Sequence, residues 1–348
     1  MRTQMIAALS MSLLAAGHAG CMVEDLPSGT GEDEVGRVAL ASDQSCPPSS
    51  CPHNTPYVHG LRIDELHYGQ PGEPGVPNQR SEQGFLMLGF TAADGQEGRI
   101  TIQDGELRAT VGEGKVLAPE DVVGGRIRVD WQVPSQAPRL YDLIITQMDY
   151  VRSWTYDVRM VPAYTIIAHD LLLTVEDQPI CKTDDGATTH AVLLANERYD
   201  VDTLRVREKV PVDGWFTIVC EHSALYEMRL AGYDPEIPAG ERFHTEPHQR
   251  QATLRMITAD YCGIGHPFTE VGRELRWQNQ AGWYQHDLSQ TSHEAIWGPD
   301  GALCLDQPRF VDRKEVEDQC FIEYCNHNTM TKLGGEWETW SLPVQTTP

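Results

Sequence analysis

The chain has 348 residues, with 27 Lys and Arg against 51 Asp and Glu, which gives a net charge of −24 at neutral pH. A surface this acidic repels phosphate backbones, so nucleic acid is not an expected partner. Hydrophobic residues make up 40% of the chain, enough for a buried core. The excess charge fits either simple solubility or a preference for cations and basic partners.

Residues 1–21 have the pattern of an export signal. Arg2 precedes an apolar run at residues 5–17, which at roughly a dozen residues is too short to span a bilayer. The sequence HAGC at residues 18–21 resembles the bacterial lipobox, although its histidine stands where leucine is usual. This resemblance implies a lipid on Cys21 and a membrane anchor, in the outer membrane of a Gram-negative cell. The alternative, ordinary cleavage after Ala19, would give a periplasmic or secreted protein.

Nine cysteines are present, and an odd number in an exported chain needs an explanation. If Cys21 carries a lipid, eight cysteines remain and predict up to four disulfides outside the cytoplasm. The candidates are Cys46, Cys51, Cys181, Cys220, Cys262, Cys304, Cys320 and Cys325. Eight cysteines can pair in about 105 ways, so the connectivity stays open. If residues 312–325 are helical, Cys320 and Cys325 lie roughly 140° apart around the axis and cannot pair with each other.

Residues 22–55 predict a disordered tether, because Glu, Asp, Ser, Gly and Pro dominate and aromatic residues are almost absent. Within it, the sequence CPPSSC could close a small loop through Cys46 and Cys51. Residues 56–165 predict an antiparallel β region, because apolar and polar residues alternate. The clearest examples are RITIQDGELRATV at 99–111, RIRVDWQV at 126–133 and WTYDVRMV at 154–161.

The first of these strand segments contains a strong turn signal. Asp104-Gly105 predicts a two-residue hairpin that places Ile102 opposite Leu107. Alternate residues on this hairpin then form one apolar face.

Residues 166–345 predict an α+β domain held by disulfides. HAVLLANERYD at 190–200 predicts a strand, and EHSALYEMRLAGYDP at 221–235 predicts a short helix. The residues around EPHQRQATLRMITADYCG predict a buried helix with Thr245 as N-cap and Gly263 at its C-terminal end. IWGPDGALC at 296–304 predicts a hairpin, and DRKEVEDQCFIEYC at 312–325 a final helix capped by Asp312. The expected fold class is therefore α+β and β-rich.

Several of these segments resemble one family in the same order. MITADYCGIGHPFTEVGRELRW, followed by EAIWGPDGALC and preceded by FTIVCEHSALYEMRLAGYDP, is similar to the ADYC domain of secreted bacterial proteins. The resemblance covers about residues 170–310 and implies no activity, cofactor or catalytic residue. Family members commonly have cysteines where Met228 and either Ala252 or Thr253 stand here. Their joint absence fits the loss of one disulfide and implies that Cys181, Cys220, Cys262 and Cys304 are bridge partners as well.

The motif at residues 259–262 invites a chemical interpretation. Cys262, with His266 and Asp260 nearby, has the residue types of a thiol nucleophile. However, Cys262 lies at the predicted C-terminal end of a helix, where the dipole opposes a thiolate, so a disulfide is the favoured interpretation. Gly263 completes the motif as the helix terminator.

Metal binding is a second interpretation of the same region. His244 and His248 are four residues apart, and Asp260 and His266 follow, which are ligand types that zinc accepts. Pro247 interrupts the helical spacing and no established zinc motif is present, so we expect neither a metal nor a cofactor.

Asp260 and Tyr261 also have structural interpretations. A carboxylate at a helix C-terminus needs compensation, which predicts a bond from Asp260 to Arg255, Arg273 or amides of the following loop. A polar site at the mouth of a groove is the functional alternative. Tyr261 is expected in the core with its hydroxyl bonded.

The aromatic residues that follow the motif also admit two interpretations. Trp277, Trp283 and Tyr284 lie among amide side chains, where exposed rings would suit stacking on sugars or peptides. Burial in the core is the expected alternative.

Together these patterns predict a cell-envelope lipoprotein that acts as a non-catalytic binding or scaffolding module. Its expected partners are the membrane, through the lipid, and an envelope protein or glycan. The alternative is an extracytoplasmic hydrolase or metal-dependent enzyme with an Asp/His site near residues 244–266.

Overall fold

The computed structural model describes residues 55–341, except residues 70–77, 135, 156–157, 184, 208–209, 270–274, 285, 287 and 290. Of the described residues, 38% lie in strands and 12% in helices, and three disulfides lie in the C-terminal region, which confirms the predicted β-rich α+β class. The export signal and Cys21, Cys46 and Cys51 lie outside the described residues. None of the described helices is long and apolar enough to cross a membrane.

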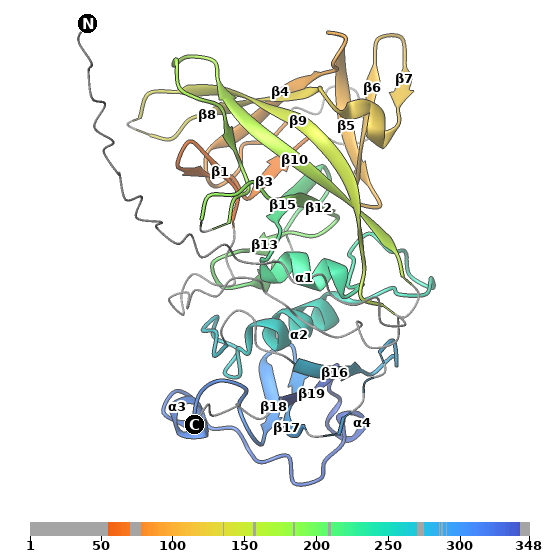
Figure 1. Ribbon diagram of the computed structural model, residues 1–348, viewed down its shortest axis with the longest axis vertical. Helices are drawn as coiled ribbons and strands as arrows, with labels where there is room; N and C mark the ends of the chain where they lie inside the picture. Colours follow the sequence, from red (N-terminus) through yellow and green to blue (C-terminus); the bar gives the residue numbers. More distant parts are fainter. Residues whose placement is uncertain are drawn as a thin grey trace, which may run out of the picture. The chain divides into compact units, whose positions relative to one another are not determined.

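The largest sheet of the described residues has 11 strands, all paired antiparallel (Figure 1). Its order is β3 (Glu65–His67), β15 (Trp215–Cys220), β12 (Ala191–Ala195), β10 (Met160–Asp170), β9 (Arg139–Arg152), β8 (Arg126–Trp131), β4 (Phe85–Thr91), β5 (Glu97–Gln103), β6 (Glu106–Val111) and β7 (Lys115–Leu117), with β11 (Gln178–Pro179) paired to β10. The domain boundary expected after residue 165 falls inside β10, and β12 and β15 belong to the same sheet. Alternation within a strand does not reveal such long-range pairing.

The hairpin of β5 and β6 has the predicted register, with Ile102 opposite Leu107. Asp104 and Gly105 both have positive φ, 57° and 73°, as a turn of this kind requires. Leu66 of β3 and Leu117 of β7, at the two ends of the sheet, share one buried cluster. One continuous buried cluster therefore extends along the whole sheet.

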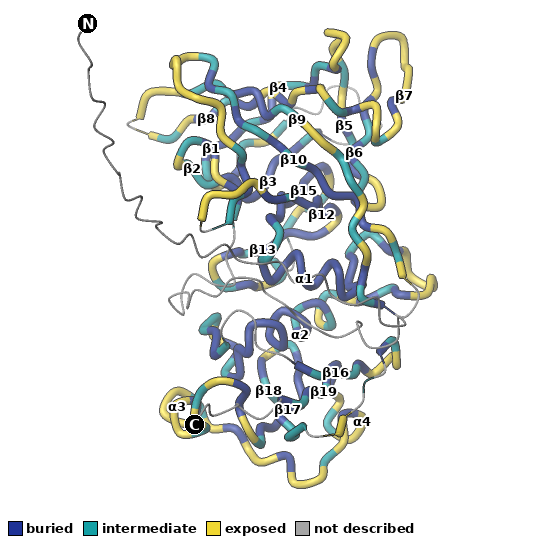
Figure 2. Tube along the Cα trace, viewed as in Figure 1, coloured by how far each residue is buried: buried dark blue, intermediate teal, exposed yellow. Residues whose placement is uncertain are grey.

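Two helices follow the large sheet, α1 (Ala224–Leu230) and α2 (Pro247–Thr258). α1 contacts α2 and β15, and Figure 2 shows both helices buried along most of their length. The N-cap of α2 is Glu246 and its C-cap is Ala259, so the expected capping by Thr245 and Gly263 is wrong. Thr245 instead accepts a hydrogen bond from Arg250 through its hydroxyl.

A four-stranded antiparallel sheet packs on α2 and forms the C-terminal region. Its order is β16 (Leu275–Asn279), β19 (Trp337–Ser341), β17 (Ser292–Gly298) and β18 (Gly301–Leu305). β17 and β18 form the predicted hairpin, with Gly298 opposite Gly301. The smaller elements of the chain are β1 (Tyr57–Val58), β2 (Leu61–Arg62), β13 (Tyr199–Asp200), β14 (Arg205–Val206) and the 3-10 helix η1 (Pro119–Val122).

The last predicted helix is shorter than expected. Asp312 caps α3 (Arg313–Glu317) as predicted, but this helix ends before Cys320, and α4 (Met330–Leu333) and β19 follow it. The strand expected over residues 154–161 is also wrong, because Trp154 lies in a bend and β10 begins only at Met160. The Trp154 amide donates to the Leu230 carbonyl at the end of α1, which turns the chain away from a strand.

Candidate functional site

The ADYC motif lies where α2 ends and turns towards the β17–β18 hairpin. Asp260 is buried, and its carboxylate accepts from the Arg255 guanidinium at 2.5 Å and from the amides of Ile264 and Gly265 at 3.1 and 2.7 Å. These are partners that the sequence predicts, whereas Arg273 lies outside the described residues. Burial lowers the pKa of Arg255, and the charge of Asp260 partly opposes this. Asp260 thus closes the loop after α2.

Tyr261 is a core residue, as expected. Its hydroxyl donates to Glu294 at 2.5 Å and accepts from the Arg309 amide at 3.1 Å, while the Arg309 side chain also donates to Glu294. Its ring stacks on Trp297 with centroids 5.0 Å apart. Burial raises the pKa of Tyr261 well above its usual value, so the phenol keeps its proton.

Cys262 forms a disulfide with Cys320, and Gly263 makes the closest approach in the motif. Gly263 has φ of 66°, and a Cβ atom there would overlap the Asp300 carbonyl. Ala302 donates its amide to the Tyr261 carbonyl at 2.9 Å, which joins the motif to β18. The motif therefore holds the end of α2 against the β17–β18 hairpin.

His266 is half-buried and packs edge-on against Phe268, with ring centroids 4.8 Å apart. The sulfur of Cys262, the candidate nucleophile, is bonded to Cys320. The other two bridges join Cys181 to Cys220 and Cys304 to Cys325. Cys320 and Cys325 are thus not partners of each other, although α3 does not contain them.

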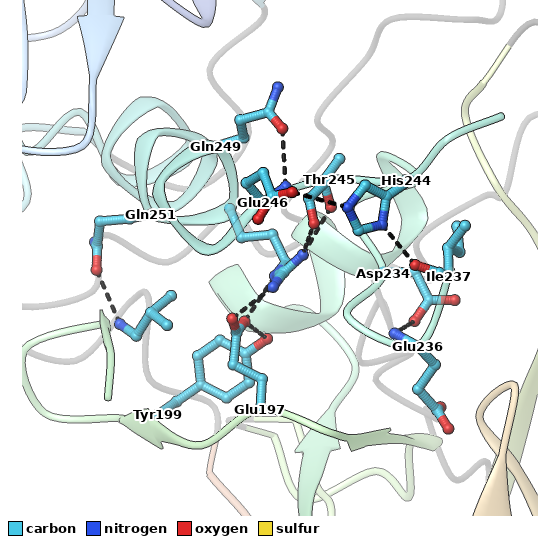
Figure 3. Close-up of polar contacts among 12 residues, drawn as sticks. Glu197, Tyr199, Asp234, Glu236, Ile237, His244, Thr245, Glu246, Gln249 and Gln251 are labelled. Carbon is cyan, nitrogen blue, oxygen red and sulfur yellow. Dashed lines mark hydrogen bonds and ion pairs between the residues drawn. The ribbon is translucent and has the colours of Figure 1, made fainter. Parts of the chain in front are cut away.

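The N-terminal end of α2 carries a second polar group (Figure 3). His244 lies between the Ile237 carbonyl and Glu246, at 2.7 Å from Nδ1 and 3.0 Å from Nε2. The hydrogen bond to the Ile237 carbonyl, followed by that to Glu246, raises the pKa of His244. Glu246 and Gln249 form the capping box of the helix. Glu246 and Gln249 therefore cap the N-terminal end of α2, and His244 is bonded to this cap through Glu246.

Beneath this end lies a buried ion pair. Glu197 accepts from two nitrogens of Arg250 at 2.8 and 2.7 Å and from the Tyr199 hydroxyl at 2.6 Å. Figure 3 shows Glu197 and Tyr199 side by side below the helix. Burial acts to lower the pKa of Arg250, but the bonds and charge of Glu197 outweigh it and leave the pKa raised.

The structure does not bring the predicted Asp/His group together. His244 and His248 lie at one end of α2, and Asp260 and His266 follow the other end. The 12 residues of this helix span roughly 16 Å at about 1.5 Å per residue. The aromatic run is mainly core, because Trp277 and Tyr284 are buried and Trp283 is half-buried.

Sequence reasoning missed an exposed aromatic segment next to the motif. Phe321 is 85% exposed and Tyr324 is 54% exposed, although disulfides hold Cys320 and Cys325 on either side of them. The expected helix over residues 312–325 concealed this arrangement. The spacing CFIEYC, two cysteines around two aromatic residues, is the signal that could have revealed it.

Residues 120–311 match the family model of the ADYC domain. The chain belongs to the ADYC domain family. The match includes β8 to β18, so the ADYC domain takes in the second half of the large sheet as well as the motif. Comparison with curated proteins and with solved structures found no match.

Proposed function

We propose that this ADYC protein is a non-catalytic binding module of the cell envelope. The observation that carries the proposal is Phe321, an aromatic side chain 85% exposed on a segment that disulfides hold at both ends. Asp260, Tyr261 and Cys262 support it, because their reactive groups are engaged in internal bonds. In this proposal the motif is the support of a binding surface.

The segment of residues 320–325 is fixed by more than its disulfides. Leu305 of β18 donates its amide to the Glu323 carbonyl at 2.9 Å, and Arg313 donates to the Ile322 carbonyl. Ile322 is buried, and the Arg313 guanidinium lies 3.7 Å from the centre of the Tyr324 ring. These contacts leave Phe321 on a rigid base.

A rigid exposed aromatic side chain is suited to binding. Burial of an exposed phenylalanine side chain is favourable by roughly 1.5–3 kcal/mol, so a partner that covers Phe321 would gain free energy of this size. Aromatic anchors dominate the energetics of protein interfaces, and a fixed segment loses little entropy on binding. Leu303 adds a further exposed apolar side chain, 39% exposed, on the neighbouring strand β18. Phe321 and Leu303 therefore supply apolar side chains of the kind found at the centre of an interface, and the acidic side chains nearby would form its rim.

Charge indicates the chemistry of the partner. Residues 312–325 contain four acidic and two basic side chains besides the capping Asp312, and the whole chain has a net charge of −24. We therefore assign the surface to an envelope protein that presents basic side chains around an apolar pocket. Opposite charges would speed the encounter, and Phe321 would fill the pocket.

Extracytoplasmic placement and the lipid anchor are part of the proposal. Three disulfides within one chain support an oxidising compartment, where such bonds persist. The lipobox-like HAGC sequence supports a lipid on Cys21. Labelling with radioactive palmitate tests this: label should enter the native chain and be absent from C21S. Label in neither protein would remove the anchor and leave a periplasmic or secreted protein.

A photo-crosslinking experiment tests the binding surface. The full chain, with p-benzoylphenylalanine in place of Phe321, would be expressed in the organism that naturally produces the protein. As a control, the same residue would replace Val116, which is 62% exposed on the edge strand β7. We expect a protein crosslink at position 321 and none at 116. The purified partner should bind at least tenfold more weakly to F321S, and more weakly as salt increases.

Three results would overturn this assignment. They are equal crosslinking at positions 321 and 116, a crosslink to a second copy of the chain, and a partner whose affinity is the same for F321S as for the native chain and does not change with salt. The melting temperature of F321S should equal that of the native chain, because the removed ring packs on little. This control separates a lost contact from a lost fold.

A further inference from the structure

A histidine, an aspartate and a cysteine converge at one end of the small sheet. A ring nitrogen of His293 in β17, a carboxylate oxygen of Asp306 after β18, and the Cys325 sulfur all lie within 4.8 Å of one another. Among the described residues, no other three His, Cys, Asp or Glu side chains are grouped so closely. Cys325 is bonded to Cys304 of β18, so a fourth donor atom is adjacent.

The histidine is held in a defined orientation. Nδ1 of His293 lies 2.8 Å from Asp306, and Nε2 lies 3.1 Å from Glu338 of β19. Glu338 is itself fixed, because Gln278 donates to its other oxygen at 2.7 Å. A carboxylate on the far nitrogen is the arrangement that orients metal-bound histidines in proteins. Nδ1 therefore faces Asp306 and can bind a metal in the tautomer that leaves this nitrogen unprotonated.

The aspartate is also oriented. The Cys325 amide donates to Oδ1 of Asp306 at 2.9 Å, so Oδ2 is the oxygen that meets the histidine. A metal between Nδ1 and Oδ2 would replace that single contact and leave the amide bond in place. The sulfurs of Cys304 and Cys325 are buried with Ile296 and Met330, which shields them from water.

We propose that Cys304, Cys325, His293 and Asp306 bind Zn²⁺ when the Cys304–Cys325 bridge is reduced. Two thiolates, one imidazole and one carboxylate form a four-ligand set of the types that zinc prefers. Zinc bonds of about 2.0–2.3 Å separate tetrahedral ligands by roughly 3.3–3.8 Å. The separations of up to 4.8 Å within the group would therefore shorten, and the two sulfurs, joined in the bridge, would move apart once the bridge is reduced. Glu338 would stay outside the metal and orient the ring of His293.

Reduction of the Cys304–Cys325 bridge requires a dithiol reductant. The dithiol breaks the S–S bond by two successive exchanges, leaves as a cyclic disulfide, and yields two protein thiols. Zn²⁺ then displaces one proton from each thiol and binds the unprotonated Nδ1 of His293. The metal joins β18 to the 320–325 segment, as the disulfide does. The region would therefore be crosslinked in both redox states.

Metal titration of the reduced chain tests the site. The full chain would carry C21S, C46S and C51S, so that cysteines outside the described residues cannot contribute. In tris(2-carboxyethyl)phosphine, which serves here as a metal-compatible reductant, we expect one Zn²⁺ per chain. With Co²⁺ as the probe, thiolate charge-transfer bands and tetrahedral d–d bands should appear. The oxidised chain should bind at least a hundredfold more weakly.

Matched variants locate the site. C262S/C320S removes the neighbouring bridge and should keep the Co²⁺ spectrum, whereas C304S/C325S should lose it. H293Q should weaken Zn²⁺ binding at least tenfold, and E338Q should weaken it by about 10- to 100-fold. Equal affinity in H293Q, or equal loss in C262S/C320S, would refute the assignment. Near-ultraviolet circular dichroism of the Zn²⁺-loaded chain must match the oxidised chain; a featureless spectrum would show binding by unfolded cysteines and overturn the proposal.

Discussion

Gly263 lies directly against the Asp300 carbonyl, and neither backbone leaves room for a side chain between them. The contact is reciprocal, because a Cβ atom on Gly301 would overlap the Tyr261 carbonyl. Two short sequences, ADYCG and GPDG, thus pack backbone against backbone. This packing explains in physical terms why both segments belong to the recognisable pattern of the domain.

Replacing Gly263 with alanine should be strongly destabilising. The new methyl group would overlap the Asp300 backbone, which cannot move without opening the β17–β18 turn. Gly334 is the matched control: its φ is 69°, against 66° for Gly263, but a Cβ atom added to it would meet no other atom within 4 Å. We expect G334A to cost about 1 kcal/mol for its positive φ, and G263A at least about 2 kcal/mol more. Urea unfolding of both variants measures the difference, and equal losses would contradict the packing account.

Removing the charge of Asp260 should leave a buried cation without its partner. D260N abolishes the ion pair with Arg255 and should cost about 3–5 kcal/mol, because both side chains are buried. D318N breaks an ion pair with Lys314 that lies on the surface and should change stability far less. Thermal unfolding at neutral pH compares the two. A D260N melting temperature equal to that of D318N would show that Asp260 has no role in the loop after α2.

The predictable part of this fold is the part that local chemistry determines. The Asp104-Gly105 turn, the alternation of β8 and the Asp312 cap each depend on neighbouring residues, and all three are present. The N-cap of α2 lies one residue beyond the expected Thr245, because Thr245 is bonded to Arg250, a tertiary contact that the sequence does not show. Helix propensity does not predict the end of α3, because the following residues turn to pair with β18, where the Leu305 amide donates to the Glu323 carbonyl.

The candidate site shows the same division. A carboxylate at a helix C-terminus predicts nearby donors for Asp260, and two of the three expected kinds, Arg255 and the amides of the following loop, bind it. The disulfide partners, the exposure of Phe321 and the grouping of His293 with Asp306 depend on which strands become neighbours. Eight cysteines allow many connectivities, and only tertiary packing selects among them.

The disulfides should stabilise the chain more where they close a longer loop, with a logarithmic dependence on loop length. Cys262 and Cys320 are 58 residues apart, and Cys304 and Cys325 are 21 apart. Loop entropy predicts a loss of about 4 kcal/mol for C262A/C320A and about 3 kcal/mol for C304A/C325A. Guanidinium unfolding under non-reducing conditions gives both values. Alkylation of Cys262 in an intact, unreduced sample would show instead that this bridge is not formed.

Glu227 should make the stability of the chain depend on pH. Its side chain is buried in α1, and one carboxylate oxygen has no hydrogen-bond partner. Burial, with a smaller effect of the nearby Glu221 charge, raises its pKa well above the usual value. A raised folded pKa means that the contribution of Glu227 is fully present below its unfolded pKa, about 4.3, and is lost as pH rises through the folded pKa.

E227Q cannot ionise and should escape this loss. We expect the free energy of unfolding of E227Q, relative to that of the native chain, to increase as pH rises from 4.5 to 8. The increase should be about 1.4 kcal/mol for each pH unit until the folded pKa of Glu227 is passed. E113Q, in the exposed turn between β6 and β7, makes the same chemical change without burial and should follow the native curve. Urea midpoints measured across this pH range decide the matter. Parallel curves for E227Q and the native chain would show that the folded chain does not raise the pKa of Glu227, in spite of its burial in α1.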